Sequence, residues 1–351
     1  MDQHSIKVKE TIVRKELNKY KADAYIFVSD VNREWYTGAW SDYGFVLVTK
    51  NKVYSFTDQR DFGKYVKFVK HAQNIKITNI DVWFNFVKHL NLKHVLIEGD
   101  YLTLNQKRKF IDPLKIKKIT EVQSVNLRQI KTNNEIAIMQ KSANIAAGCE
   151  NHIRKWIKVG MTEKQVEKEV YRYFGEHGAS GASFGPITVF GKNAGDPHAQ
   201  VGNNKLKSGD CILIDIGCIY EGYCSDVTRT YAIGKPNAKV QEMLDVVKAA
   251  QALALSKIRV GMTGQEVDAI ARNYIKKHYY GYNIPHGVGH GVGRQIHEQP
   301  MNNQLNDQPL PLDSIVTIEP GIYNEYGGAR IEDTVVVKNN GCVILTKKAI
   351  K

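Results

Sequence analysis

The sequence of 351 residues predicts a two-domain protein of the mixed α/β (α+β) class. Three features predict it: short apolar runs alternate with a helical stretch before residue 125, a long helical pattern covers 126–157, and two similar segments follow it. Helix-spaced apolar residues such as Ile136, Met139 and Ile145 mark the long helix. The length is sufficient for two domains, each with its own core.

The first domain is predicted from five runs that are rich in β-branched and aromatic residues. A helical stretch around 61–71 lies between the third and fourth runs. Alternating strands and helices are typical of an α/β domain, which we expect to end near residue 125. The runs are DAYIFVSD (23–30), YGFVLVTK (43–50), KVYSFTD (52–58), KHVLIEGD (93–100) and KIKKITEV (115–122).

The second domain contains an internal repeat. VGMTEKQVEKEVYRYFGEHG (159–178) is similar to VGMTGQEVDAIARNYIKKHYYG (260–281). Each copy has a threonine at a helix N-cap position and Gln or Glu three residues later, which is the capping-box arrangement. We expect two halves related by a pseudo-two-fold axis, with a site where they meet. The alternative is a chance similarity between two capped helices.

Composition excludes several classes of function. The net charge is +13, but the lysines are scattered without a recognition motif, which predicts a solvated basic surface and no nucleic-acid partner. No run of about 18 apolar residues occurs, so no membrane segment is expected. The N-terminal residues lack the apolar segment of a secretion signal. Five cysteines in mostly apolar segments predict reduced thiols and a cytoplasmic location.

The segment CILIDIGCIYEGYCSDVTRT (211–230) places two carboxylates close together. A hairpin that turns at Glu221-Gly222 would pair Thr228 with Asp215, and period-two alternation would put Asp226 on the same side. An unpaired charge in an apolar interior costs several kcal/mol or more, so it needs a cation, a metal or a shifted pKa. The hairpin therefore predicts a bound cation, although either aspartate alone could be structural.

Three further segments supply similar polar residues in apolar or glycine-rich surroundings. IPHGVGHGVGRQIHEQP (284–300) contains His290, SIVTIEPGIY (314–323) contains Glu319, and GGARIEDTVVV (327–337) contains Glu332. Each residue alone has a structural alternative, such as a strand terminus or a solvated charge. Together with the two aspartates they exceed the needs of one tetrahedral zinc and suit a dinuclear site. Oxygen-rich donors favour Mn²⁺ or a similar ion.

These segments resemble the metallopeptidases of the pita-bread fold, the family of methionine aminopeptidase, aminopeptidase P and prolidase. The resemblance covers 127–351 and implies a catalytic domain with pseudo-two-fold symmetry. The family's ligands fall in the stretches IDIG, SDVTRT, GHGVG, TIEPGIY and RIEDT, at spacings of 11, 64, 29 and 13 residues. The implied metal ligands are Asp215, Asp226, His290, Glu319 and Glu332.

Two features are similar to the proline-specific branch of that family. DAYIFVSDVNREWYTG and FTDQRDF resemble the creatinase-type N-terminal domain, which implies a smaller α/β domain over 1–126 and the catalytic domain over 127–351. In addition, His286 lies four residues before His290, and Arg330 two before Glu332. The resemblance implies hydrolysis of the Xaa-Pro bond at the N-terminus of dipeptides or short peptides, and a homodimer.

The resemblance also assigns roles to residues around the metals. It implies that a hydroxide bridging two metal ions attacks the scissile carbonyl, with Glu319 as ligand and proton acceptor. His297 would bond the carbonyl or the tetrahedral intermediate, and His198 would assist the departing proline nitrogen. His286 and Arg330 would line the subsite beyond the scissile bond, or support the site without touching substrate. The two ions are expected to be Mn²⁺, with Co²⁺, Zn²⁺ or Fe²⁺ as alternatives.

Two other functions are compatible with the fold that the resemblance implies. One is a creatinase-like hydrolase that works without metal. The other is a non-catalytic peptide- or protein-binding relative that has lost the metal ligands. The presence of all five ligand residues, together with His198 and His297, argues against both.

Overall fold

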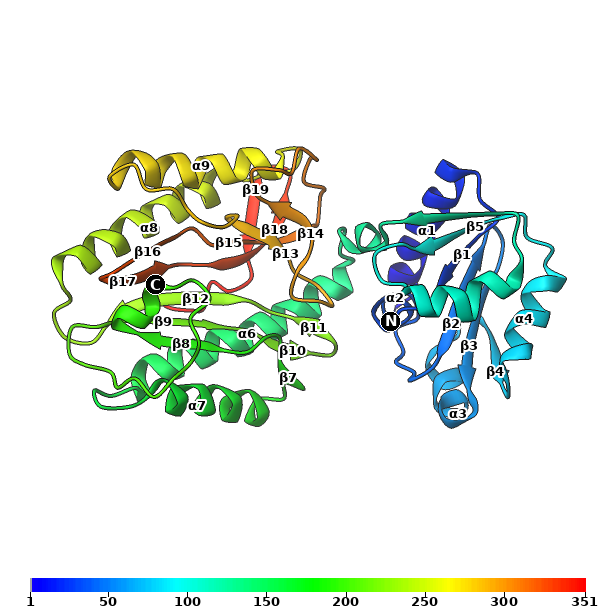
Figure 1. Cartoon of the computed structure of the whole chain (residues 1–351), viewed down its shortest axis with the longest axis horizontal. Coiled ribbons are helices and arrows are strands. Elements are labelled where there is room, and N and C mark those ends of the chain that lie inside the picture. The colour runs from blue at the N-terminus through cyan, green and yellow to red at the C-terminus, as the bar shows by residue number, and fades with distance from the viewer. Residues whose placement is uncertain (1) are drawn as a thin grey trace. The chain divides into compact units, whose positions relative to one another are not determined.

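A computed structural model describes residues 2–351, which form two compact units (Figure 1). The first unit ends at Arg128 and the second begins at Gln129. The first is built on one six-stranded sheet, and the second contains four smaller sheets.

The N-terminal unit has the strand order β4-β3-β2-β1-β5-β6. β2 runs antiparallel to β1 and β3, whereas β3–β4, β1–β5 and β5–β6 are parallel pairs. The strands are β1 (Ala24–Phe27), β2 (Gly44–Thr49), β3 (Val53–Asp58), β4 (Gln73–Ile77), β5 (His94–Glu98) and β6 (Lys118–Val122); the main helices are α1 (Gln3–Tyr20), α2 (Asp30–Thr37), α3 (Gln59–Phe68) and α4 (Ile80–His89), and α5 (Leu104–Gln106) is one turn.

Both faces of this sheet are buried. On β1, Ala24 and Ile26 pack into one apolar cluster, whereas Tyr25 and Phe27 pack into another. Alternating side chains point to opposite faces of a strand, so helices must cover both faces. This is why β1, β2 and β5 read as nearly continuous apolar runs. β4 was missed because its residues QNIKI are mostly polar and lie at the sheet edge.

The C-terminal unit places helices on either side of its strands, with α6 and α7 on one side and α8 and α9 on the other (Figure 1). The helices are α6 (Asn133–Trp156), α7 (Glu163–Glu176), α8 (Ala238–Lys257) and α9 (Gly264–His278). The strands are β7 (Gly181–Ala182), β8 (Ile187–Phe190), β9 (Cys211–Ile216), β10 (Cys218–Tyr220), β11 (Tyr223–Cys224), β12 (Val227–Ala232), β13 (Gly289–Gly291), β14 (Glu298–Asn302), β15 (Ile315–Ile318), β16 (Gly321–Asn324), β17 (Gly327–Arg330), β18 (Asp333–Lys338) and β19 (Gly341–Ile344).

The long helix α6 begins later than the sequence pattern indicated. Thr132 caps it, and Glu135 completes a capping box, so the helix begins at Asn133. Residues 124–128 instead form a short 3-10 helix. A capping box satisfies two backbone donors that would otherwise lack partners, which makes this a defined start point.

The internal repeat has a structural counterpart. Thr162 and Gln165 form a capping box at the start of α7, and Thr263 and Glu266 form one at the start of α9. α6 packs against α7, and α8 packs against α9. Each copy of the repeat therefore supplies the second helix of a packed pair. The strands between the two pairs carry the residues described in the next section.

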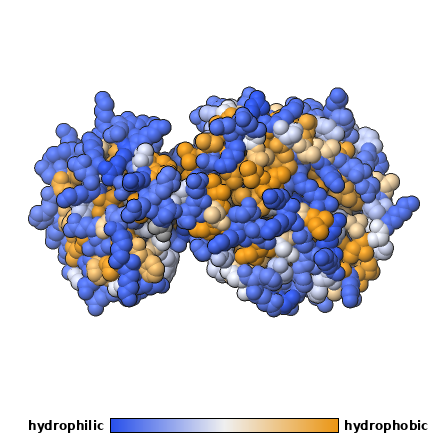
Figure 2. Space-filling model, turned by 180° about the vertical axis from the view of Figure 1, so that it is seen from behind, coloured by the Kyte–Doolittle hydropathy of each residue, from blue (hydrophilic) through white to orange (hydrophobic). Residues whose placement is uncertain are grey.

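Figure 2 shows a face of the protein that is mostly hydrophilic, with apolar patches on the larger unit. None of the helices within residues 2–351 is long and apolar enough to cross a membrane. All five cysteines are free thiols, and four of them are buried.

Glu150 on α6 is fully buried, and its two carboxylate oxygens have no hydrogen-bond partner among residues 2–351. Burial raises the pKa of this carboxyl from 4.5 to about 8, although Arg229 and Arg154 oppose the shift. A pKa raised in the folded state means that folding favours the protonated form. The stability that this proton supports is complete below about pH 4.5 and is lost as the pH rises towards 8.

We therefore expect the protein to lose stability between pH 5.5 and pH 8, by up to about 1.4 kcal/mol per pH unit from this group. Glu150→Gln keeps the shape but cannot ionise, so its stability should vary less with pH. Urea unfolding at several pH values measures the difference. Glu325→Gln, at an exposed turn, is the control and should follow the parent protein. Equal pH slopes for Glu150→Gln and the parent would contradict this account.

Candidate metal and catalytic site

Asp215 and Asp226 lie on one antiparallel hairpin. Asp215 is on β9 and faces Thr228 on β12, as the sequence predicted, and Asp226 directly precedes β12. The turn residues Glu221 and Gly222 both have positive φ, 48° and 78°, which is typical of a two-residue type I′ turn. The turn therefore sets the register that brings both aspartates to the same region.

His290 lies at the centre of β13, between two glycines. A Cβ on Gly289 would come within 2.0 Å of the Thr317 carbonyl oxygen, and one on Gly291 within 2.4 Å of the Gln299 carbonyl oxygen. The neighbouring backbones therefore require glycine on both sides of the histidine. This explains why the sequence around His290 is GHG.

The ring of His290 is oriented for binding a cation. Its Nδ1 lies 3.0 Å from the Gly291 carbonyl oxygen, so Nδ1 carries the proton and donates it there. The other ring nitrogen, Nε2, lies 3.5 Å from Asp226 Oδ2 and 3.6 Å from Glu319 Oε1. A ring nitrogen that faces two carboxylate oxygens is an arrangement that suits a metal ion.

Glu319 and Glu332 come from strand ends that meet the hairpin. Glu319 directly follows β15 and Glu332 directly precedes β18, and these strands are antiparallel neighbours. The Thr228 hydroxyl donates a hydrogen bond of 2.7 Å to Glu332 Oε2. Thr228 thus joins the hairpin to the second glutamate.

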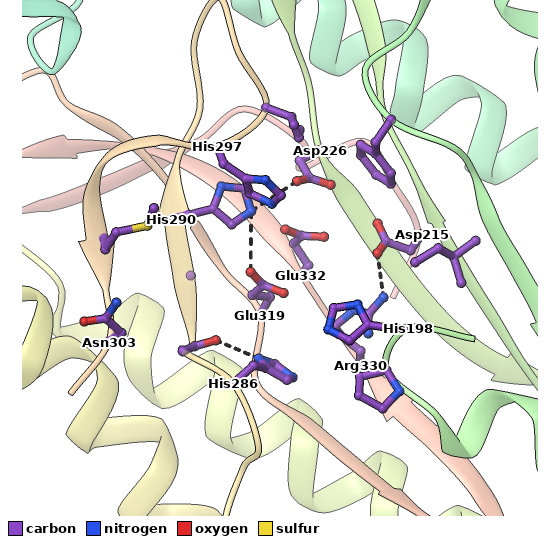
Figure 3. Close-up of a pocket in the computed structure, with 17 residues that line it drawn as sticks. His198, Asp215, Asp226, His286, His290, His297, Asn303, Glu319, Arg330 and Glu332 are labelled. Atoms are coloured by element: carbon purple, nitrogen blue, oxygen red, sulfur yellow. Dashed lines mark hydrogen bonds and ion pairs between the residues drawn. The ribbon is translucent and has the colours of Figure 1, made fainter. Parts of the chain in front are cut away.

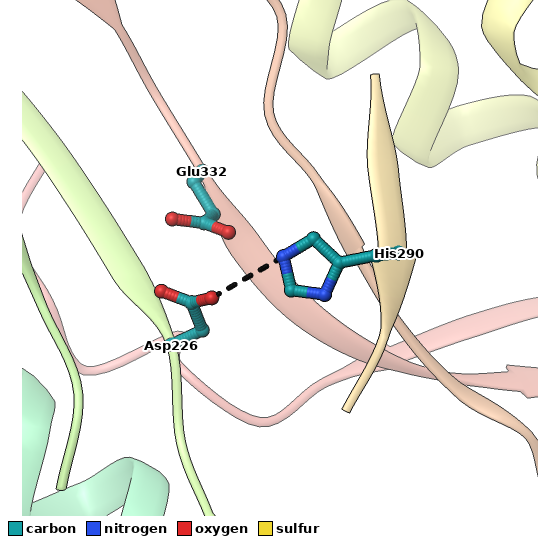
Figure 4. Close-up of side chains that lie close together, drawn as sticks. All are labelled: Asp226, His290 and Glu332. Carbon is teal, nitrogen blue, oxygen red and sulfur yellow. Dashed lines mark ion pairs between the residues drawn. The ribbon is translucent and has the colours of Figure 1, made fainter. Parts of the chain in front are cut away.

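All five predicted ligands line one cavity of about 360 Å³ (Figure 3). Asp226, His290 and Glu332 form a group whose ligand atoms all lie within 4.8 Å of one another (Figure 4). Asp215 and Glu319 lie in the wall of the same cavity. The structure therefore brings together the five residues from segments that are up to 117 positions apart in the sequence.

The carboxylates in the wall of this cavity need nearby positive charge. Burial raises the pKa of Asp215, Asp226 and Glu332, and for the latter two the neighbouring carboxylates raise it further. Asp215 Oδ1 is buried without a hydrogen-bond partner among residues 2–351. Four carboxylates and an imidazole are donors that fit divalent cations.

Arg330 is the one arginine or lysine that lines this cavity within residues 2–351, and it is only 4% exposed. Its Nη2 lies 2.5 Å from Asp215 Oδ2, its Nη1 donates to the Tyr323 hydroxyl at 2.7 Å, and its Nε donates to Thr228 Oγ1 at 3.3 Å. The Tyr323 hydroxyl also lies 3.0 Å from His286 Nε2. A continuous chain of contacts thus connects Asp215 to His286.

Tyr323 was not predicted from the sequence. Gly321 faces Arg330 across the β16–β17 hairpin, and Tyr323 is two residues further along the same face. A Cβ on Gly321 would lie 2.4 Å from the Tyr323 hydroxyl, so this glycine makes room for it. The register of this hairpin is the signal that could have placed Tyr323 beside Arg330.

The remaining predicted residues lie in the wall of the same cavity. His297 directly precedes β14, and its ring centroid is 4.4 Å from that of His290. Burial and the neighbouring His290 lower the pKa of His297, and burial lowers the pKa of His286, which favours the neutral form of both imidazoles. His198 is exposed, on the loop that follows β8. The apolar part of the wall, which was not predicted, includes Phe184, Ile187, Pro197, Ile296 and Met301.

Comparisons with known proteins agree with this architecture. The Creatinase/Prolidase N-terminal domain matches residues 11–128, and Metallopeptidase family M24 matches residues 137–339. A Mycoplasma genitalium protein, provisionally named an Xaa-Pro aminopeptidase, is 34% identical over 97% of this chain and 96% of its own.

Two solved structures are similar along almost the whole chain. The Xaa-Pro dipeptidase from Bacillus anthracis is 32% identical, with a TM-score of 0.92 and 97% of each chain covered. The prolidase from Pyrococcus furiosus is 31% identical, with a TM-score of 0.87, covering 95% of this chain and 98% of its own. These matches confirm the creatinase-type domain and the pita-bread domain that the sequence predicted, and the chain belongs to metallopeptidase family M24.

Proposed function

We propose that this protein is a metal-dependent peptidase that hydrolyses the Xaa-Pro bond at the N-terminus of short peptides. The observation that carries the proposal is the cavity in which four carboxylates and the Nε2 of His290 converge beside His297 and His198. The names of the similar proteins support proline specificity, because they include Xaa-Pro dipeptidases and aminopeptidases.

Two divalent cations would be held by five side chains, and Mn²⁺ is the proposed ion because the donors are mostly oxygens; Co²⁺, Zn²⁺ and Fe²⁺ are the alternatives. When bound, such a pair supplies a hydroxide nucleophile at neutral pH and polarises the scissile carbonyl. Four carboxylates balance the four positive charges of the two ions. The proposed ligands are Asp215, Asp226, His290, Glu319 and Glu332.

Two residues, Glu319 and His297, are assigned to the side of the scissile carbonyl. Glu319 accepts the proton of the attacking water, because its carboxylate lies in the cavity wall beside His290. His297 is neutral, so one ring nitrogen carries a hydrogen that can be donated to the carbonyl oxygen as negative charge develops there. Neutrality matters because an imidazolium would compete with the cations for the carboxylates.

On the leaving-group side, His198 delivers a proton to the proline nitrogen. Its exposed position at the cavity wall allows it to exchange that proton with solvent. His286 and Arg330 form the wall of the proline subsite, and both are held in place by the Tyr323 hydroxyl. Arg330 also fixes Asp215, so it couples the subsite to a metal ligand.

Several expectations from the sequence remain predictions: the domain boundary between residues 126 and 127, the homodimer and the cytoplasmic location. Five free thiols, four of them buried, are consistent with a reducing compartment. Size-exclusion chromatography with light scattering would measure the oligomeric state.

Metal removal tests the proposed function directly. We expect the protein treated with chelator to lose hydrolysis of Xaa-Pro-Yaa tripeptides and to recover it when Mn²⁺ is added, because the nucleophile depends on the cations. The matched Xaa-Ala-Yaa peptides should be cleaved far more slowly. Full turnover after verified metal removal would support a metal-independent hydrolase instead, and binding without cleavage under all metal conditions would support a non-catalytic relative.

Thr228→Val removes the hydroxyl that donates to Glu332 while preserving the shape of the side chain. Hydrogen bonds to metal ligands orient them, and their loss costs roughly 10–100-fold in metal affinity. Isothermal titration of the metal-free protein with Mn²⁺ should show a decrease of this size. Thr188→Val is the control, because its buried hydroxyl donates to the Glu163 carbonyl and touches no proposed ligand. Equal affinities for Thr228→Val and the parent would contradict the assignment.

His297→Ala should lower kcat by roughly 10²–10³ if the imidazole stabilises charge in the transition state. Steady-state kinetics on an Xaa-Pro-Yaa tripeptide, at saturating Mn²⁺, measures the effect. His278→Ala is a suitable control, since that histidine is exposed on α9 and does not line the cavity. An unchanged kcat would show that His297 serves only in packing.

A further inference from the structure

We propose that the segment 346–351, which follows β19, positions the metal ligand Glu332 through Asp333 and Arg229, and thereby controls the affinity for the cations. The inference rests on the proposed function, but it concerns residues that do not line the cavity. A buried ion pair, Arg229 with Asp333, connects the segment to Glu332.

Two consecutive residues of β12 hold Glu332 in place. The Thr228 hydroxyl donates to its carboxylate at 2.7 Å, and the Thr228 carbonyl oxygen accepts from its backbone N–H at 3.1 Å. Arg229 Nη1 donates to the Glu332 carbonyl oxygen at 2.5 Å and to the Thr228 carbonyl oxygen at 2.9 Å. The position of the Arg229 guanidinium therefore determines where the backbone of this metal ligand lies.

Asp333 holds the same guanidinium from the face that points away from the cavity. Successive side chains of a strand point to opposite faces, so Asp333 lies behind the wall that Glu332 lines. Asp333 Oδ1 lies 2.8 Å from Arg229 Nη2, and both side chains are buried. A buried ion pair is favourable only when good geometry and further hydrogen bonds compensate for the loss of water. The other partners of this pair therefore decide how firmly Arg229 is held.

The segment 346–351 contacts both members of this ion pair. The Thr346 hydroxyl donates to Asp333 Oδ1 at 2.8 Å, and Thr346 is fully buried. The Ala349 carbonyl oxygen accepts from Arg229 Nη2 at 3.1 Å. The two atoms that form the ion pair, Oδ1 and Nη2, thus both have a second partner in the segment.

Lys351 completes the surroundings of Asp333. Its Nζ lies 2.6 Å from Asp333 Oδ2 and donates to Gln251 Oε1 at 2.8 Å. The amide nitrogen of Gln251 in turn donates to Asp333 Oδ2 at 2.8 Å. Lys351 therefore supplies a cation and also orients the amide that bonds the same carboxylate oxygen.

Thr346 is also connected to a second metal ligand. Its hydroxyl oxygen accepts from the Thr334 backbone N–H at 3.2 Å, and the Thr334 hydroxyl donates to the Asp226 carbonyl oxygen at 2.7 Å. Asp226 and Glu332 belong to the compact group of possible ligands that also contains His290. One segment outside the cavity is thus linked to the backbones of two residues in that group.

Lys351→Met tests the inference, because it removes the cation and the donor to Gln251 while keeping a long side chain. The Lys351 side chain is 30% exposed, so we expect the variant to fold. Isothermal titration of the metal-free protein with Mn²⁺ should show affinity reduced roughly three- to tenfold, less than the roughly 10–100-fold typical of residues that bond a ligand directly. Lys351→Arg can form the same ion pair and should keep the parental affinity.

Lys338→Met is the matched control. Lys338 is the last residue of β18, and its Nζ lies 2.5 Å from Asp313 Oδ1, so the substitution also removes an ion pair of that strand. This pair does not contact Asp333 or a proposed ligand, and the variant should bind Mn²⁺ as the parent does. A similar loss of affinity in Lys338→Met would show that the effect of Lys351→Met is not specific.

A double-mutant cycle tests whether Lys351 acts through Asp333. Lys351→Met should cause little further loss of Mn²⁺ affinity in the isosteric Asp333→Asn background, because the carboxylate that it acts on is already absent. Losses that multiply would contradict this connection.

Urea unfolding of the metal-free proteins separates positioning from stability. A purely structural role would lower the midpoint for Lys351→Met and leave its Mn²⁺ affinity equal to that of the parent, and this result would overturn the inference. If the parent protein itself binds no Mn²⁺, the proposed function fails.

Discussion

The concentration of negative charge in one buried cavity is the constraint on which the rest of the catalytic unit depends. Asp215, Asp226, Glu319 and Glu332 face one another with a single arginine among them. Carboxylates in such a place either take up protons or bind cations. The pKa values of three of them are raised because their ionised forms are unfavourable in this cavity. Two divalent ions would stabilise the ionised forms. The surrounding hydrogen bonds serve to hold these groups in place against their repulsion.

The two halves of the unit contribute to that cavity in a similar way. A hairpin of the first half supplies both aspartates, and strands of the second half supply His290 and both glutamates. Thr228 connects the halves by donating to Glu332. Each ligand lies on a strand or directly at its end, where the backbone is fixed by ladder hydrogen bonds. Rigid placement of this kind reduces the reorganisation needed when metal or substrate binds.

Arg330 connects residues on different sides of the cavity. Its contacts with Asp215 and Tyr323 orient a metal ligand and, through the tyrosine, His286. One buried network thus supports a metal ligand and positions His286.

Local patterns in the sequence were enough to indicate the strands of the first domain, the capped repeat helices, the 211–230 hairpin register and the five ligand residues. Those features depend on neighbours in the chain or on spacing shared with a known family. The edge strand β4, the start of α6 and the role of Tyr323 were missed. The side-chain partners of Arg330 and the orientation of the His290 ring could be decided only by the tertiary structure, because they arise where segments up to 115 residues apart meet.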